Sequence, residues 1–185
     1  MRIIALEGLS GVGKSTLAPL VAQRIGAELL PAIPMDLDAQ RKQADASENV
    51  TARHVFYLWA IATACQRARE SATGALWLVE SYIGRAMAYH LGMGSSLQLA
   101  PWTLAPKPQV SVMITCNEQV RLQRISARGE PTYWRRRSES SIESIRDAYN
   151  EYADLSVPND NTSPDCAAEQ IARAVRAMLN EGANG

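Results

Sequence analysis

A glycine-rich segment near the start of the chain carries residue types that bind phosphate. It reads LEGLSGVGKST from Leu6 to Thr16, with the spacing G-x-x-x-x-G-K-S. Glycines let the backbone curl so that successive N–H groups point at an anion, and the helix that follows adds its positive end. In such a loop Lys14 reaches the outer phosphates and the Ser15 hydroxyl binds Mg²⁺. The expected phosphate-binding residues are Gly8, Leu9, Ser10, Gly11, Val12, Gly13, Lys14, Ser15 and Thr16.

A carboxylate at the end of an apolar segment is the second candidate for chemistry. Glu80 closes the run ALWLVE, residues 75–80, which is typical of a buried strand. An acid at this place can hold Mg²⁺ through water or take a proton from an attacking hydroxyl. The alternative is a surface carboxylate at a strand end.

Arginine is concentrated between residues 121 and 146. Arg121, Arg124 and Arg128 are spaced i, i+3 and i+7, so they share one face of a predicted helix. Phosphoryl transfer spreads negative charge over the phosphate oxygens, and guanidinium groups neutralise that charge. The alternative is a solvated face paired with nearby glutamates, namely Glu118, Glu130 and Glu139.

Strands and helices are predicted to alternate along the chain. We expect strands at residues 2–7, 27–30, 75–80, 109–116 and within 155–164. We expect helices at residues 14–26, 51–72, 84–94, 117–127, 142–152 and from 164 onward. Residues 35–47 are expected to form a surface helix or loop, and residues 130–138 an arginine-rich loop. This alternation predicts an α/β fold, with a five-stranded parallel sheet flanked by helices.

The positions of the apolar residues predict which helix faces are buried. The buried face of the helix at 51–72 is expected to comprise Val55, Leu58, Trp59, Ala62 and Cys65. That of the last helix is expected to comprise Ile171, Ala174, Val175, Met178 and Leu179. In a parallel sheet, ligands bind at the carboxyl ends of the strands. The phosphate loop and Glu80 both follow such ends, so we expect them to meet.

The composition limits the classes of function. The 185 residues fit a single domain, residues 1–185, and carry 19 basic and 19 acidic side chains, so there is no overall basic excess for a nucleic acid. The longest apolar stretch, HVFYLWAIATAC, is too short to cross a bilayer. The apolar N-terminal run is typical of a buried strand and not of a secretory signal. The three cysteines show no metal or disulfide spacing, and a cytoplasmic location is expected.

Three segments together resemble the thymidylate kinase-like and deoxynucleoside kinase-like P-loop kinases. LEGLSGVGKST is similar to the family opening E-G-x-D-G-x-G-K-S-T. VESYIGRAMAYHLGMG resembles the thymidylate kinase segment D-R-Y-x-x-S-x-x-A-Y-Q-G, and VRLQRISARGE resembles the lid-helix pattern L-x-R-x-x-x-R-G. The order of and distances between the three segments also fit, so the resemblance covers most of the chain.

The resemblance implies a P-loop NTPase fold with an arginine-bearing lid, roughly residues 121–140, that closes over ATP. It implies MgATP as the phosphoryl donor and a nucleoside or nucleoside monophosphate as the acceptor. The catalytic residues would be Lys14, Glu80, Arg124 and Arg128, with Ser15 and Glu80 as the metal site. The acceptor would lie near Asp36, Tyr57, Tyr82, Arg85 and Tyr89, with Asp36 and Asp38 as candidate bases. Trp59 could also line that site or simply pack in the core.

The departures from the family pattern fall on the acceptor side. Ser10 stands where thymidylate kinases have aspartate, and Ser81 where both families have arginine. Arg85 could replace the missing charge, or could be an exposed helix arginine. The expected function is therefore ATP-dependent transfer to a nucleoside monophosphate or nucleoside. The alternatives are a kinase of a non-nucleotide hydroxylated small molecule and a nucleotide-binding regulatory module. The resemblance also leaves a homodimer open, since thymidylate kinases are often dimers and the long helix could supply an interface.

Overall fold

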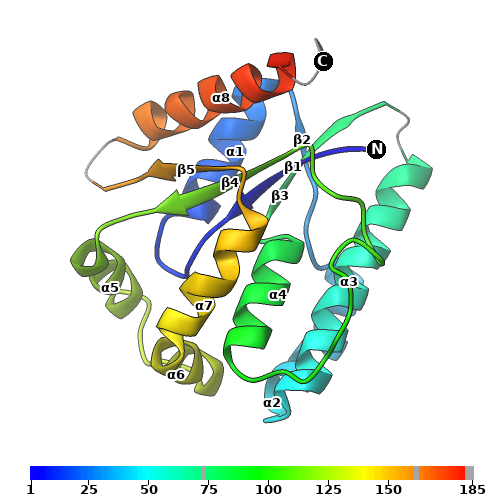
Figure 1. Cartoon of the computed structure of the whole chain (residues 1–185), viewed down its shortest axis with the longest axis vertical. Coiled ribbons are helices and arrows are strands. Elements are labelled where there is room, and N and C mark those ends of the chain that lie inside the picture. Colours follow the sequence, from blue (N-terminus) through cyan, green and yellow to red (C-terminus); the bar gives the residue numbers. More distant parts are fainter. Residues whose placement is uncertain (72–73, 161–162, 182–185) are drawn as a thin grey trace.

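The computed structural model describes residues 1–71, 74–160 and 163–181. Its centre is a sheet of five parallel strands in the order β2-β3-β1-β4-β5 (Figure 1). The strands are β1 (Arg2–Glu7), β2 (Glu28–Leu29), β3 (Leu76–Glu80), β4 (Val110–Thr115) and β5 (Leu155–Pro158). The predicted five-stranded parallel sheet is confirmed, and β1 lies at its centre.

Helices cover both faces of the sheet. They are α1 (Lys14–Ile25), α2 (Asp38–Ala46), α3 (Val50–Ser71), α4 (Ile83–Gly92), α5 (Glu118–Ser126), α6 (Tyr133–Ser140), α7 (Ile142–Tyr149) and α8 (Pro164–Glu181). Two short 3₁₀ turns are η1 (Met35–Leu37) and η2 (Asn150–Tyr152). Figure 1 shows α1 and α8 together on one face, and α3, α4 and α7 on the other. The C-terminal end of the expected helix at 51–72, Ala72, lies outside the described residues.

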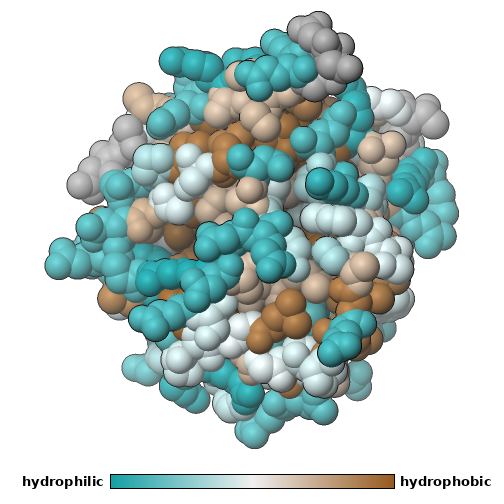
Figure 2. All heavy atoms as spheres, in the orientation of Figure 1, coloured by the Kyte–Doolittle hydropathy of each residue, from teal (hydrophilic) through white to brown (hydrophobic). Residues whose placement is uncertain are grey.

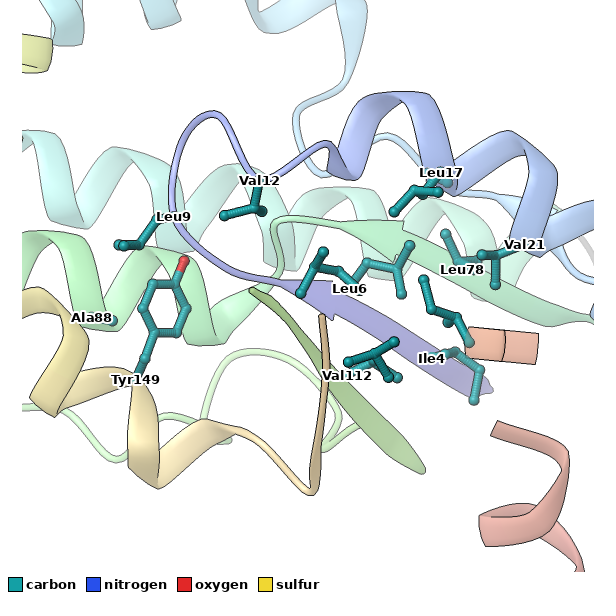
Figure 3. Close-up of a cluster of buried hydrophobic side chains, with 14 of the residues drawn as sticks. Ile4, Leu6, Leu9, Val12, Leu17, Val21, Leu78, Ala88, Val112 and Tyr149 are labelled. Carbon is teal, nitrogen blue, oxygen red and sulfur yellow. The ribbon is translucent and has the colours of Figure 1, made fainter. Parts of the chain in front are cut away.

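The central strand is buried on both sides because its side chains alternate between the two faces. Ile4 and Leu6 belong to the cluster that includes Leu17 and Val21 of α1 (Figure 3). Ile3 and Ala5 point the other way, into the cluster formed with α3 and α4. This packing fixes the carboxyl end of β1, from which the phosphate loop continues.

The predicted buried face of α3 is wrong in part. Leu58 and Cys65 are buried as expected, but Val55 is 49% exposed and Trp59 is 46% exposed. The helix is rotated so that His54 and Ile61 face the interior instead. Histidine is not counted as hydrophobic, so His54 did not contribute to the apolar pattern. The buried face predicted from that pattern was therefore rotated about the helix axis from the face that is buried.

The prediction of a loop at residues 130–138 is also wrong, because most of these residues belong to α6. Thr132 caps this helix, since its side chain accepts a hydrogen bond from the backbone N–H of Arg135. Trp134 and Ser138 are one turn apart and both are buried. The three consecutive arginines between them, of which only Arg136 is exposed, hid the helical pattern.

The surface in Figure 2 is a mixture of hydrophilic and hydrophobic side chains, without a continuous apolar band on the face shown. Among the described residues, no helix has both the length and the apolar character needed to cross a membrane. The long helix α3 instead has its buried residues on one side.

Candidate active site

The carboxyl ends of β1 and β3 bring the phosphate loop and Glu80 together. Leu6 and Glu80 are paired in the parallel register of these strands. The Ser15 hydroxyl, in the first turn of α1, donates a hydrogen bond of 2.7 Å to Glu80 Oε1. The predicted meeting of the loop with Glu80 is confirmed.

The hydroxyl and carboxylate in this contact fit a magnesium ion. Mg²⁺ prefers oxygen ligands and is usually held by one or two protein groups, with water and substrate phosphates completing the octahedron. The described residues contain no cluster of three His, Cys, Asp or Glu side chains that would enclose a metal without such a substrate. Ser15 and Glu80 would therefore hold Mg²⁺ only together with phosphate groups.

The loop has the backbone shape that an anion site requires. Gly8, Gly11 and Gly13 have φ values of 135°, 91° and 101°, which L residues rarely adopt. Lys14 is buried beneath the loop, and its amine donates to the carbonyl oxygens of Gly8 at 2.9 Å and Leu9 at 3.0 Å. Burial lowers the pKa of Lys14 to about 7.

A small polar cavity of about 120 Å³ lies against this loop. It is lined by Ser10, Gly11, Gly13, Lys14, Ser15, Glu80, Ser81, Arg85 and Arg128. Leu9 and Val12 instead point their side chains into the hydrophobic core (Figure 3), and Thr16 is exposed outside the cavity. Of the expected loop residues, five therefore face the cavity, namely Ser10, Gly11, Gly13, Lys14 and Ser15.

The three arginines expected on one helix face have three different environments. Arg121 is 1% exposed and pairs with Glu118 and Glu139, while its guanidinium also donates to the carbonyl oxygen of Ser10. For Arg121 the alternative of glutamate pairing is therefore correct, although the site is buried and not solvated. Through these contacts Arg121 connects α5 and α6 to the phosphate loop.

The other two arginines lie nearer the expected nucleotide. Arg124 donates to the carbonyl oxygens of Val12 in the loop, Asn159 and Asp160, the last two just after β5. Arg128 follows α5 and lines the small cavity. The structure thus brings Arg128 to the phosphate site and gives Arg124 a place at the side of the loop.

A larger cavity of about 540 Å³ adjoins the small one. The predicted acceptor residues Tyr57, Arg85 and Tyr89 line it. Other lining residues were not predicted from the sequence, among them Arg41, Arg53, His90, Trp134 and Arg135. Arg53 could have been found, because it is four residues before Tyr57 and therefore lies on the same face of α3.

Three residues predicted for the acceptor side, Tyr82, Asp36 and Asp38, do not reach this cavity. Tyr82 is fully buried, and its hydroxyl donates to the carbonyl oxygen of Pro106 at 2.9 Å. Asp36 is on the surface in η1, where Arg67 pairs with it at 2.6 Å and lowers its pKa. Asp38 likewise pairs with Arg41 and Lys42. None of the three lines the cavity.

Ser10 lies where the two cavities meet. Its backbone N–H donates to the Tyr89 hydroxyl at 2.7 Å, and its side-chain oxygen accepts from Arg85 at 3.3 Å. The Arg85 guanidinium stacks on the Tyr89 ring at 3.9 Å. Beside them Ser81 has a φ of 63°, the only positive value at a described residue other than glycine. Such backbone strain is concentrated at functional sites.

A polar network closes the far side of the larger cavity. The Asp45 carboxylate accepts from Arg53 at 2.9 Å and from the Tyr57 hydroxyl at 3.0 Å. The Asp45 carbonyl oxygen accepts from the Trp134 indole at 2.8 Å. Arg53 lies between the Tyr57 and Trp134 rings, 4.4 and 4.6 Å from their centroids. These contacts join α2, α3 and α6 across the cavity.

Two stacked histidines support α3 and α4 behind this network, with ring centroids 4.8 Å apart. Burial lowers the pKa of His54 to about 4, and burial together with the charge of Arg53 lowers the pKa of His90 to about 2. Arg53 donates to His90 Nε2, so the His90 Nδ1–H donates to the Ala86 carbonyl oxygen. Both rings are therefore neutral at pH 7.

We predict that the histidine pair makes the fold sensitive to acid. Their folded pKa values lie below the ordinary value, so their stabilisation is complete above pH 6.5 and is lost as the pH falls. The loss by pH 5 is about 2 kcal/mol per imidazole. Titration of the imidazole carbons by NMR, from about pH 8 to about pH 5, should show no midpoint for either ring. A midpoint near the ordinary value would contradict this assignment.

Comparisons with known proteins agree with the architecture. A thymidylate kinase from Candida albicans superimposes with a TM-score of 0.71 and 16% identity, over 97% of this chain and 92% of that one. A deoxyadenosine kinase from M. mycoides, with dCMP and dCDP bound, superimposes with a TM-score of 0.66 and 15% identity, over 95% of this chain and 100% of that one. A shikimate kinase from Acinetobacter baumannii, in complex with shikimate, superimposes with a TM-score of 0.55 and 14% identity, over 96% of this chain and 94% of that one.

These likenesses define a class: the chain has the fold of the P-loop kinases. Within that class, the resemblance to thymidylate and deoxynucleoside kinases expected from the sequence is confirmed at the level of the fold. No family model and no curated protein sequence matches the chain.

Proposed function

We propose that the protein is an ATP-dependent phosphotransferase that moves the γ-phosphoryl group of ATP to a small acceptor, in the first place a nucleoside monophosphate. One observation carries this proposal. The small cavity at the phosphate loop and the larger cavity share Ser10, Glu80, Ser81 and Arg85. A donor phosphate in one cavity and an acceptor in the other would meet at these four residues.

The charges of the larger cavity favour an anionic acceptor. Four arginines line it, and Glu80 is the only carboxylate among its described lining residues. Asp38 and Asp45 pair with Arg41 and Arg53, whereas Arg85 and Arg135 have no carboxylate within 4 Å in the part of the chain that the structure describes. A phosphate oxygen is already ionised and needs no general base. The absence of Asp36 and Asp38 from the cavity therefore also favours a monophosphate.

Catalysis would consist mainly of positioning and charge neutralisation. The loop N–H groups and Lys14 would hold the outer phosphates, and Arg85 and Arg128 would neutralise charge on the transferred group. Mg²⁺ bound at Ser15 and Glu80 would neutralise the phosphate oxygens. The Tyr57 and Tyr89 rings would hold a flat acceptor, and Trp134, which lines the larger cavity, would exclude water.

A kinase of a non-nucleotide hydroxylated molecule is the second candidate. Ser10 and Ser81 are uncharged residues where the related families have aspartate and arginine, so Glu80 and Arg85 are the charged residues that remain at the junction, which suits an alcohol. Here Glu80 would be the base, although Ser15 already binds it. A nucleotide-binding regulatory module is the third candidate, and the geometry of Lys14, Ser15 and Glu80 makes it the weakest.

Transfer of labelled phosphate from MgATP tests these candidates directly. The panel should contain nucleoside monophosphates, nucleosides and hydroxylated metabolites, with EDTA as the metal-free control. Label on a monophosphate supports the first candidate, and label on an uncharged alcohol supports the second. Nucleotide binding without transfer to any acceptor, unchanged by Glu80→Gln, would support the regulatory module.

The exposed face of α3 supports a homodimer. Val55 and Trp59 are large apolar side chains in solvent, one turn apart. We predict that sedimentation equilibrium gives a dimer and that Trp59→Ser shifts it toward monomer. The matched control is Thr63→Ser, one turn further along the helix. A monomeric wild-type protein would contradict this prediction.

A further inference from the structure

Arg121 of α5 is a buried arginine that the proposed reaction does not use. It is 1% exposed, and two carboxylates hold its guanidinium. Glu118, on the same helix, accepts from Nε at 3.1 Å and from Nη2 at 2.7 Å. Glu139, on α6, accepts from Nη1 at 2.9 Å and also pairs with Nη2. Two carboxylates neutralise this charge, so Arg121 is poorly suited to bind a phosphate itself.

The same guanidinium also contacts the phosphate loop. Arg121 Nη1 donates to the Ser10 carbonyl oxygen at 3.2 Å, across 111 positions of the sequence. A Cβ atom at Gly11 would lie 2.8 Å from the Arg121 carbonyl oxygen, so the loop is packed directly against the backbone of α5. The loop and α5 therefore meet at the peptide unit between Ser10 and Gly11.

This contact fixes the direction of one N–H group of the loop. In a planar trans peptide unit, the C=O and N–H bonds point in opposite directions. The Ser10 carbonyl oxygen faces Arg121, so the Gly11 N–H points away from Arg121. Gly11 lines the small cavity, and no group among the described residues accepts from its N–H. This N–H is therefore available to a donor phosphate oxygen.

The loop does not fix this peptide unit by itself. Gly11 has a φ of 91°, and glycine adopts positive and negative φ values about equally readily. A hydrogen bond from outside the loop is therefore needed to keep its N–H directed at the cavity. In the part of the chain that the structure describes, Arg121 is the donor to the Ser10 carbonyl oxygen.

The next glycine of the loop is oriented in a similar way. The Val12 carbonyl oxygen, in the peptide unit that leads to Gly13, accepts from Arg124 at 3.3 Å and from the Asn159 side chain at 2.8 Å. Two donors hold this second unit, so the loss of one leaves the other in place. Arg121 is therefore the more informative residue to test.

We propose that Arg121 is a positioning residue that holds the peptide unit between Ser10 and Gly11 with its N–H directed at the donor phosphates. Glu139 pairs with the same Nη1 atom that donates to Ser10, so this orientation also depends on the position of α6. The same helix carries side chains that line the larger cavity, so a movement of α6 on the acceptor side would reach the donor loop. For its effect on ATP, the proposal rests on the proposed function.

The hydrogen bond to the loop can be measured by NMR without any ligand. A hydrogen bond to a carbonyl oxygen moves the signal of the carbonyl carbon downfield. The loss of this bond in Arg121→Lys should therefore move the Ser10 carbonyl carbon signal upfield. Lysine keeps the positive charge, but its single amine cannot reach Ser10 and both carboxylates as the guanidinium fork does.

The two glutamates that pair with Arg121 form a matched pair of variants. Glu139→Gln weakens the pairing of Nη1 and leaves Arg121 paired with Glu118, so it should move the Ser10 signal upfield by a smaller amount. Glu118→Gln removes the same charge from the same guanidinium, but its contacts are with Nε and Nη2. It should leave the Ser10 signal in place.

Nucleotide affinity provides the second measurement. Affinity for the magnesium complex of a non-hydrolysable ATP analogue should fall about tenfold to about a hundredfold in Arg121→Lys, the effect of losing one hydrogen bond to a charged group. It is measured at a temperature at which circular dichroism shows that the variant is folded. A merely structural residue would lower the unfolding temperature and leave this affinity unchanged, and that result would overturn the inference.

The dependence on α6 has its own measurement, amide hydrogen exchange. In the wild type, binding of the analogue should slow exchange in α6, because the loop and this helix share Arg121. Glu139→Gln should lose this protection, and Glu118→Gln should keep it. Absent protection in the wild type, or equal protection in the two variants, would overturn the role of α6.

The ligand-free measurement separates this inference from the proposed function. Failure of the wild type to bind the analogue would overturn the proposed function, and the Ser10 carbonyl signal would still decide the role of Arg121. An unchanged Ser10 signal in Arg121→Lys would overturn the inference. If Arg121→Lys does not fold, the glutamate variants decide it, and a Ser10 signal that is the same in both would overturn it.

Discussion

Replacing Lys14 with alanine is expected to reduce phosphoryl transfer at least about 10²- to 10³-fold, the effect of removing one essential charged donor from a transition state. The amine is buried under the loop and bonded to the Gly8 and Leu9 carbonyl oxygens, so the substitution removes a fixed positive charge from the phosphate site. The loss should appear in kcat and in the affinity for MgATP, both measured with labelled ATP.

The matched control for this substitution is Lys107→Ala, which removes a lysine that is exposed on the surface. It should leave both constants unchanged. Folding is checked by thermal unfolding, since Lys14→Ala should leave a folded protein. Transfer that persists at the wild-type rate in Lys14→Ala would overturn the assignment of the phosphate site.

Replacing Arg85 with methionine should reduce kcat roughly 10²- to 10³-fold while the affinity for MgATP changes little. Arg85 lines both cavities, bonds to Ser10 and stacks on Tyr89, and no carboxylate lies within 4 Å of it in the described chain. Its charge is therefore available to the transferred phosphoryl group. Methionine keeps much of the side-chain volume, so the expected loss comes from the charge.

Arg85→Lys should recover only part of this activity, because lysine keeps the charge but loses the planar stacking and the second donor. Arg69→Met, on the exposed side of α3, is the control and should match the wild type. A variant Arg85→Met with an unchanged kcat and only a raised KM for the acceptor would show that Arg85 binds the ground state and transition state equally.

The donor half of the site was predictable from the sequence because it depends on short-range patterns. A loop with fixed spacing follows a strand, and a parallel sheet brings Glu80 to the same edge. The contact between Ser15 and Glu80 follows from these two facts alone. The parallel order of the strands made it independent of any detail of side-chain packing.

The acceptor half was less predictable because its residues come from helices far apart in the sequence. Trp134 and Asp45 are bonded across 89 positions, and no local pattern indicates such a contact. The failed placement of Tyr82 has a local cause: it follows the strained residue Ser81, which turns the chain so that its ring enters the core.

The hydrogen bond from the Ser10 N–H to the Tyr89 hydroxyl has a thermodynamic consequence for the two substrates. This N–H is already engaged, so it is not free to bind a phosphate, and it joins the loop to Tyr89 of α4. An acceptor that contacts and shifts the Tyr89 ring would therefore also shift Ser10 and change the shape of the phosphate loop that binds the donor. Binding free energies that share a contact are linked, and the linkage is reciprocal. The affinity for ATP should then depend on acceptor occupancy by the same factor as the affinity for the acceptor depends on ATP.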